Sequence, residues 1–155
     1  MNINTDEEFN LWVLLAQTRE SLFKARQKEL VKYDISPRQS AALFVIKTIG
    51  GNATAAEITR HLFRELHSTY EMLCRMEKGR LIKGVKNRKK AGRVIYKLTP
   101  KGLRAYNQSI KRDSIRKIIS CLTREEREQL KSSLKKLRDA ALKILTLNEL
   151  PFPPV

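Results

Sequence analysis

Apolar residues recur at helical spacing near both ends of the chain. In residues 5–32 they fall three or four positions apart, which predicts one amphipathic helix about 40 Å long at 1.5 Å per residue. In residues 123–147 they alternate in steps of four and three, the a/d-type stripe that suits a partner helix. These two stripes include Phe9, Trp12, Leu130, Leu134, Leu137, Ala141 and Ile144. Long terminal helices expose more apolar face than a small domain covers, so we expect them to form a homodimer. A bundle within one chain is the alternative.

Local signals for helix starts divide the rest of the chain. In a capping box, a Ser or Thr hydroxyl satisfies a free backbone N–H and a Glu or Gln three residues later reaches back. This pattern occurs at Thr5, Thr54 and Thr123. Proline follows Ser36 and Thr99, and it suits the first helical position because its missing N–H costs nothing there. A further helix is expected near Ser68, and the segment after Thr99 is expected to form one helix reaching Leu122.

The middle of the chain has a different pattern. Residues 81–86 and 93–98 are rich in β-branched and aromatic residues and flank a polar loop, 87–92, that ends in Gly92. This arrangement predicts a β-hairpin with a basic tip. The fold class expected is therefore mainly α with a small hairpin. We divide the chain into an N-terminal dimerisation helix (1–34), a central lobe (35–100), C-terminal dimerisation helices (101–148) and an extended, proline-rich tail (149–155).

Charge narrows the choice of partner. The 155 residues include 32 Lys and Arg against 16 Asp and Glu, a formal net charge of +16. Such an excess indicates a polyanionic partner, with nucleic acid first and an anionic membrane second. No apolar run approaches the length of a membrane-spanning helix, and residues 1–8 do not resemble a signal peptide, so no membrane partner is expected. Two cysteines without paired spacing indicate a reducing cytoplasm.

The order helix, turn, helix and basic hairpin indicates a winged helix-turn-helix. The helix at 55–62 would brace the motif, and the helix near 68–78 would enter the major groove of duplex DNA, where its first residues read base edges. The candidate contacts on this helix are His67, Ser68, Thr69, Tyr70 and Arg75. Residues 80–97 hold eight basic residues and no acidic one. The expected wing contacts are Lys86, Arg88, Lys89, Lys90 and Arg93, with a merely solvated basic face as the alternative.

With these motifs in order, residues 9–145 resemble the MarR family of transcriptional regulators. The resemblance is carried by segments 35–39, 55–58, 68–69, 75–78, 81–82, 98–102 and 122–126. It implies a homodimer on a pseudo-palindromic DNA operator, usually as a repressor, and a pocket for a small-molecule effector between the dimerisation helices and the DNA-binding lobe. We also expect Arg38, in the first segment, to contact DNA. Wings of this family usually carry Asp-x-Arg, which is absent here, so either Arg88 or Arg93 could take the arginine's role.

The same sequence argues against several other functions. The four aspartates are widely separated, so no carboxylate cluster suits metal-dependent catalysis, and we expect no enzyme, cofactor or metal site. Cys74 and Cys121 are expected to be packing residues rather than redox sensors. Phe9, Trp12, Phe23, Tyr33 and Phe44 could line an effector pocket, although a place in the core is favoured. The rival function is a non-specific architectural DNA- or RNA-binding protein, which would not prefer one sequence over random duplex.

Overall fold

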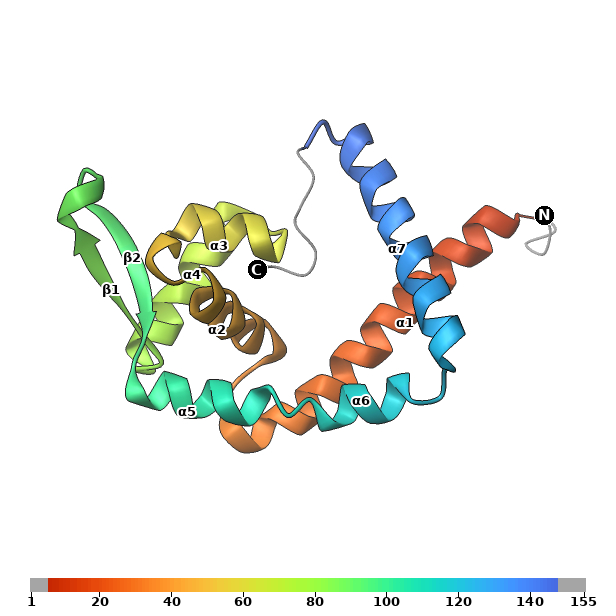
Figure 1. The fold of residues 1–155 in the computed structure, drawn as a ribbon, viewed down its shortest axis with the longest axis horizontal. Helices are drawn as coiled ribbons and strands as arrows, with labels where there is room; N and C mark the ends of the chain where they lie inside the picture. The colour runs from red at the N-terminus through yellow and green to blue at the C-terminus, as the bar shows by residue number, and fades with distance from the viewer. Residues whose placement is uncertain (1–5, 148–155) are drawn as a thin grey trace.

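The computed structural model describes residues 6–147, apart from the side chain of Lys90. Its elements run in the order shown in Figure 1: α1 Glu7–Leu30, α2 Pro37–Ile49, α3 Ala55–Leu62, α4 Leu66–Lys78, β1 Ile82–Asn87, β2 Arg93–Leu98, α5 Pro100–Ser109, α6 Asp113–Ile119 and α7 Arg124–Ile144. The strands pair antiparallel, from Ile82 opposite Leu98 to Asn87 opposite Arg93. The expected fold class, mainly helical with one hairpin, is confirmed.

The elements form two parts, which lie on opposite sides of Figure 1. We call residues 35–109, with α2 to α5 and the hairpin, the hairpin lobe, and α1, α6 and α7 the arm. The main core lies in the hairpin lobe, where Leu43, Ile58, Leu73 and Met76 are fully buried. Burying such a side chain contributes about 1.5–3 kcal/mol. Leu30, at the end of α1, is the residue of that helix that joins this core.

Four of the expected helix starts are capped as the sequence indicates. Ser36 and Thr123 form reciprocal capping boxes, and Thr54 and Thr99 each accept a hydrogen bond from a backbone N–H in the first turn. The start of α1 differs, because Asp6 is the cap and its carboxylate accepts from the Phe9 N–H at 2.9 Å. Thr5, the expected cap, lies outside the described residues.

The expected single helix from Thr99 to Leu122 is wrong. The helix is interrupted between Ser109 and Asp113, where Arg112 adopts a left-handed conformation with φ of 52°. A carboxylate oxygen of Glu29 accepts a hydrogen bond from the Asp113 N–H at 2.8 Å, so α1 supplies the cap that starts α6. Glu29 lies 84 positions before Asp113, so the sequence pattern around Asp113 does not indicate this cap.

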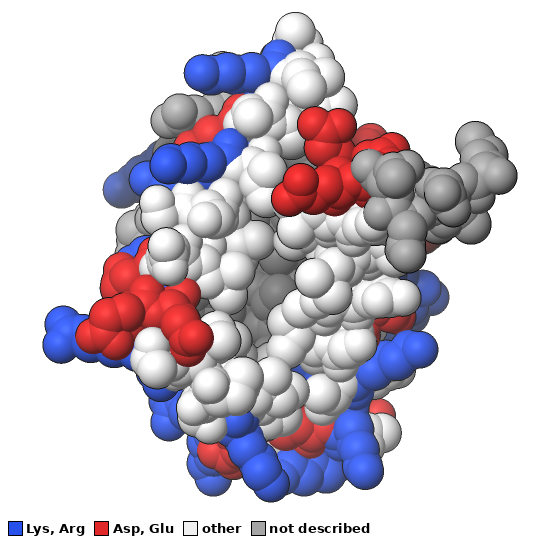
Figure 2. All heavy atoms as spheres, turned by 90° about the vertical axis from the view of Figure 1, so that its right-hand side faces the viewer, with Lys and Arg blue, Asp and Glu red and all other residues white. Residues whose placement is uncertain are grey.

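The arm carries apolar side chains that face outward. Trp12 is 69% exposed, Phe9 and Leu137 are exposed as well, and Ile144 is 85% exposed. Figure 2 shows this side of the molecule as a largely uncharged surface bordered by basic and acidic side chains. In the part of the chain that the structure describes, no helix combines the length and apolarity needed to cross a membrane.

Candidate nucleic-acid interface

Helices α3 and α4 form the helix-turn-helix expected from the sequence. The turn between them is tight because Phe63 adopts a left-handed conformation, with φ of 50°, and ends α3. Helix α4 therefore begins at Leu66, two positions before the expected Ser68. Its buried face is Thr69, Met72, Leu73 and Met76, the spacing of one side of a helix.

The outer face of α4 presents most of the candidate residues, with one correction. His67, Tyr70 and Arg75 are exposed, and Ser68 is partly exposed. The expected exposure of Thr69 is wrong: its side chain is 0% exposed, and its hydroxyl donates to the Glu65 carbonyl at 3.2 Å. The helix phase explains this, because Thr69 lies one turn before Leu73 on the buried side.

The hairpin is held beside α4 by contacts that its first strand, β1, makes with that helix. A carboxylate oxygen of Glu77 accepts from the Gly84 N–H at 2.7 Å. A Cβ on Gly84 would lie 2.8 Å from Val94 Cγ1, so the absence of a side chain at Gly84 allows the Val94 side chain to pack this close to β1. On the second strand, burial and then the nearby Glu77 carboxylate raise the pKa of the Tyr96 hydroxyl. These contacts attach the hairpin to α4, and the hairpin loop projects beyond them.

The hairpin carries an exposed basic surface with no acidic neighbour in its own segment. Among the predicted wing contacts, Lys86, Arg88, Lys89 and Arg93 are exposed, and the Lys90 side chain is not described. The loop is shaped by Asn87, whose side-chain oxygen accepts from the Lys89 N–H at 3.0 Å. Exposed cations on a fixed hairpin beside an exposed helix face suit a phosphate backbone.

Three arginines from different elements lie close enough for their charges to affect one another: Arg38 in α2, Arg64 after α3 and Arg75 in α4. Burial lowers the pKa of the Arg64 guanidinium, and the positive charges of Arg38 and Arg75 lower it further. Within residues 6–147, none of the three arginines forms an ion pair. Arg38 instead lies over the Phe23 ring, 5.7 Å from its centroid. Sequence reasoning found Arg38 and Arg75 but missed Arg64, which follows α3 and carries no local signal.

A cleft of about 1060 Å³ lies between α1, α2, the α3–α4 turn and the end of α7. Phe23 and Leu142 supply apolar walls, and Arg19, Arg38 and Arg64 supply cationic ones. The Thr59 hydroxyl oxygen on this lining is buried and has no hydrogen-bond partner among the described residues. Of the five aromatic residues considered, Phe23 lines this cleft. The core placement favoured for Phe9 and Trp12 is wrong, because both are exposed on the arm.

Among the cysteines and histidines, all but His61 are surface residues. Cys74 and Cys121 are free and exposed, so their expected role as packing residues is wrong. His67 lies 3.3 Å from Glu71 in an exposed pair, whereas the side chain of His61 is 5% exposed. Within residues 6–147, no cluster of three or more His, Cys, Asp or Glu side chains could hold a metal ion.

The predicted dimerisation residues are all exposed and all belong to the arm. Leu130 and Leu134, with Ile119 and Leu122 of the preceding segment, line an apolar groove of about 370 Å³ edged by basic side chains. Leu137, Ala141 and Ile144 continue along α7 and are exposed. An apolar face of this kind suits a macromolecular contact.

This chain is similar in structure to several solved proteins. No family model matches the sequence, and no curated protein matches it in sequence. The organohalide-sensing RdhR transcriptional regulator, solved in a 2,4-dichlorophenol-bound form, is 29% identical, with 98% of this chain and 93% of that chain covered and a TM-score of 0.86. S. aureus MepR in complex with DNA is 22% identical, with 88% and 99% covered and a TM-score of 0.77. A mutant MarR from E. coli complexed with operator DNA is 23% identical, with 86% and 97% covered and a TM-score of 0.78. These last two comparisons concern the fold alone.

Proposed function

We propose that this chain, which has the winged helix-turn-helix fold of MarR-family transcriptional regulators over nearly its whole length, is a sequence-specific DNA-binding regulator. Its solved structural neighbours are transcriptional regulators rather than enzymes, in agreement with the non-catalytic role expected from the sequence. The observation that carries the proposal is the exposed face of α4, held beside a hairpin of exposed cations. A fixed helix with a fixed basic flank matches a major groove and its adjacent phosphates.

The division of labour on DNA follows from exposure and chemistry. His67, Ser68 and Tyr70 lie in the first part of α4 and would read base edges, since they combine exposure with polar groups. Buried Thr69 would support the helix. Arg38 and Arg75 would bind phosphate oxygens together with the wing residues Lys86, Arg88, Lys89, Lys90 and Arg93. The net charge of +16 favours association with DNA and makes it depend on salt.

We further propose that two chains associate through their arms. The support is the outward-facing apolar surface of α1 and α7, which one chain leaves uncovered. A two-fold dimer presents two α4 helices in opposite orientations, so its operator would be a pseudo-palindrome. Truncation before Thr123 removes α7 and is expected to give a monomer in analytical ultracentrifugation. A truncated chain that still sediments as a dimer would exclude this interface.

The cleft next to α4 is the proposed site of a small-molecule effector. The support is its volume, its apolar and cationic walls and its position between arm and hairpin lobe. An RdhR structure holds 2,4-dichlorophenol, which shows that a regulator of this fold accepts a small aromatic compound. In this proposal the protein represses its target genes, and effector binding releases it from DNA.

Selection of bound sequences from random duplex DNA tests the proposed function. Full-length protein is expected to enrich an inverted repeat, because each chain of the dimer reads one half-site. Enrichment of no sequence at physiological salt would instead support a non-specific architectural protein.

A further inference from the structure

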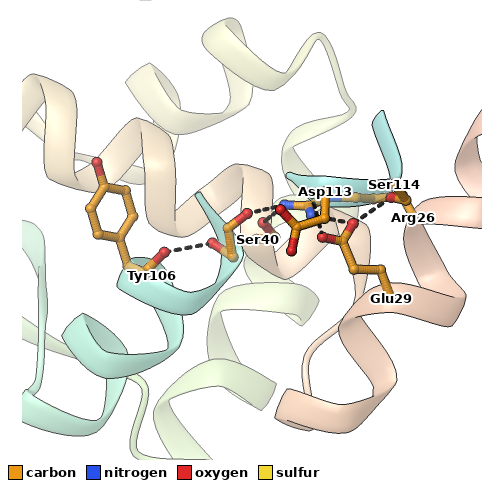
Figure 3. A network of polar contacts seen from close by, with 7 residues as sticks. Arg26, Glu29, Ser40, Tyr106, Asp113 and Ser114 are labelled. Atoms are coloured by element: carbon orange, nitrogen blue, oxygen red, sulfur yellow. Dashed lines mark hydrogen bonds and ion pairs between the residues drawn. The ribbon is translucent and has the colours of Figure 1, made fainter. Parts of the chain in front are cut away.

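A largely buried ion pair lies where the arm meets the hairpin lobe. Arg26 and Glu29, in the last two turns of α1, are 2.7 Å apart, with side chains 13% and 9% exposed (Figure 3). Buried charges are costly unless each is paired and hydrogen-bonded. Arg26 and Glu29 are paired with each other, and each also forms hydrogen bonds to other residues. Those hydrogen-bond partners show which elements the pair connects.

Arg26 connects α1 to two helices of the hairpin lobe. Its Nη2 donates to the Ser109 carbonyl, at the end of α5, at 2.5 Å and to the Ser40 hydroxyl of α2 at 3.3 Å. The Ser109 hydroxyl in turn donates to the Tyr106 carbonyl at 2.8 Å. The guanidinium therefore binds α2 and α5 at one point.

Glu29 connects the same turn of α1 to the next helix of the arm. Its carboxylate accepts hydrogen bonds from the Asp113 N–H at 2.8 Å and from the Ser114 hydroxyl. Burial tends to raise the pKa of the Glu29 carboxyl, but the hydrogen bonds from Ser114 and Arg26, the charge of Arg26 and the Asp113 N–H hold it below its usual value. The charged carboxylate is thus the form that caps α6.

The chain passes between lobe and arm at two places, and each contains a residue in the left-handed conformation. Asp34, with φ of 55°, ends the short turn after α1, and Arg112, with φ of 52°, lies between α5 and α6. Rotation of the lobe about these crossings would separate Arg26 from Ser40 and Ser109, while Glu29 holds Arg26 and the start of α6 together on the arm side.

We propose that Arg26 and Glu29 are positioning residues that fix the angle between the hairpin lobe and the arm. This inference rests on the proposed dimeric DNA binding for its consequence: the angle sets the separation of the two α4 helices, and hence the half-site spacing that the dimer accepts. The pair is remote from α4 and the hairpin loop, so it acts on spacing rather than on contact with bases.

The cysteines allow a direct measurement of the angle. Cys74 lies on α4 in the hairpin lobe and Cys121 follows α6 in the arm; both are exposed, and the chain has no others. Spin labels on both, in full-length protein diluted with unlabelled chains and without DNA, report the lobe–arm distance by pulsed electron paramagnetic resonance. We expect one narrow distribution for the unaltered protein and a broadened or displaced one for Glu29→Gln and Arg26→Met.

The matched control is Glu20→Gln, which removes the same charge from an exposed position on α1. Its distribution is expected to match that of the unaltered protein. If Glu29→Gln or Arg26→Met does not fold, Ser114→Ala and Ser40→Ala each remove a single hydrogen bond of the network and take their place. Distributions that coincide with the unaltered one in all folded variants overturn the proposal.

Binding to selected duplexes gives the second readout. The folded variants are expected to bind an isolated half-site normally and to lose at least about fivefold in affinity for the intact inverted repeat, with less discrimination against altered spacing. An equal loss on the half-site would mean that the pair merely supports the lobe, and would overturn the proposal. If the unaltered protein prefers no sequence, the proposed function fails, while the resonance measurement still decides the role of the pair.

Discussion

Removing charge from the hairpin should change how strongly DNA binding depends on salt. The perturbation is the triple variant Arg88→Ala, Lys89→Ala and Arg93→Ala. All three side chains are exposed, and none forms an ion pair within the described residues. Their loss therefore removes cations without breaking packing or freeing a carboxylate.

The expected magnitude follows from counterion release. Each phosphate neutralised contributes about 0.9 to the slope of log affinity against log salt, so three contacts contribute about 2.7. Between 50 and 200 mM salt, a fourfold change, this amounts to a factor of about 40 in affinity for each chain. The change should be similar for selected and random duplexes, because phosphate contacts carry little sequence information.

Fluorescence anisotropy over a salt series measures the slope. The matched control removes three exposed cations from α6 and the turn before it, and α6 lies away from the hairpin in Figure 1: Lys111→Ala, Arg116→Ala and Lys117→Ala. The magnitude of the slope should fall by about 2.7 for each chain in the hairpin variant and should stay nearly unchanged in the control. An unchanged slope in the hairpin variant, or an equal loss in the control, would refute a specific role for the hairpin.

Three further outcomes can be checked separately. Thr69→Val should leave discrimination between duplexes unchanged because that side chain is buried, whereas Tyr70→Ala should lose about 1–3 kcal/mol of it; equal effects in competition binding would contradict this assignment. Gly102→Ala would place a Cβ 1.8 Å from the Leu81 carbonyl oxygen. Better helix propensity, worth about 1 kcal/mol, cannot offset that clash, so urea unfolding should show a net loss of at least about 2 kcal/mol, and a more stable variant would count against the close contact. Because the pKa of Glu29 is lowered by folding, its contribution is full above the usual value of about 4.5 and is lost as pH falls below it. The unfolding free energy of the unaltered protein should therefore fall more steeply than that of Glu29→Gln on acidification below pH 5, and parallel curves would disagree.

Features that depend on neighbours in sequence were predictable here. The caps at Ser36, Thr54, Thr99 and Thr123 and the hairpin need only a few adjacent residues, and all of them formed. Thr69 shows the limit of such reasoning. Its exposure depends on the phase of α4, which was set by a left-handed turn at Phe63 that propensity disfavours.

Features that join distant segments were not predictable from one sequence. The break before α6 depends on the carboxylate of Glu29 in α1, and the cleft brings Arg19, Thr59 and Arg64 together from separate elements. Nothing in the spacing of these residues marks them as neighbours. The outward direction of Trp12 belongs to the same class, since helical spacing gives a shared face but not what covers it.

The most direct test of the central claim is a competition measurement at about 0.15 M salt, with the most enriched duplex against a scrambled duplex of equal length. A dimeric sequence-specific regulator should bind the selected inverted repeat with two chains per duplex and at least about 1,000-fold more tightly than the scrambled one. Affinities within a few-fold of each other would contradict that claim and leave a non-specific DNA-binding protein.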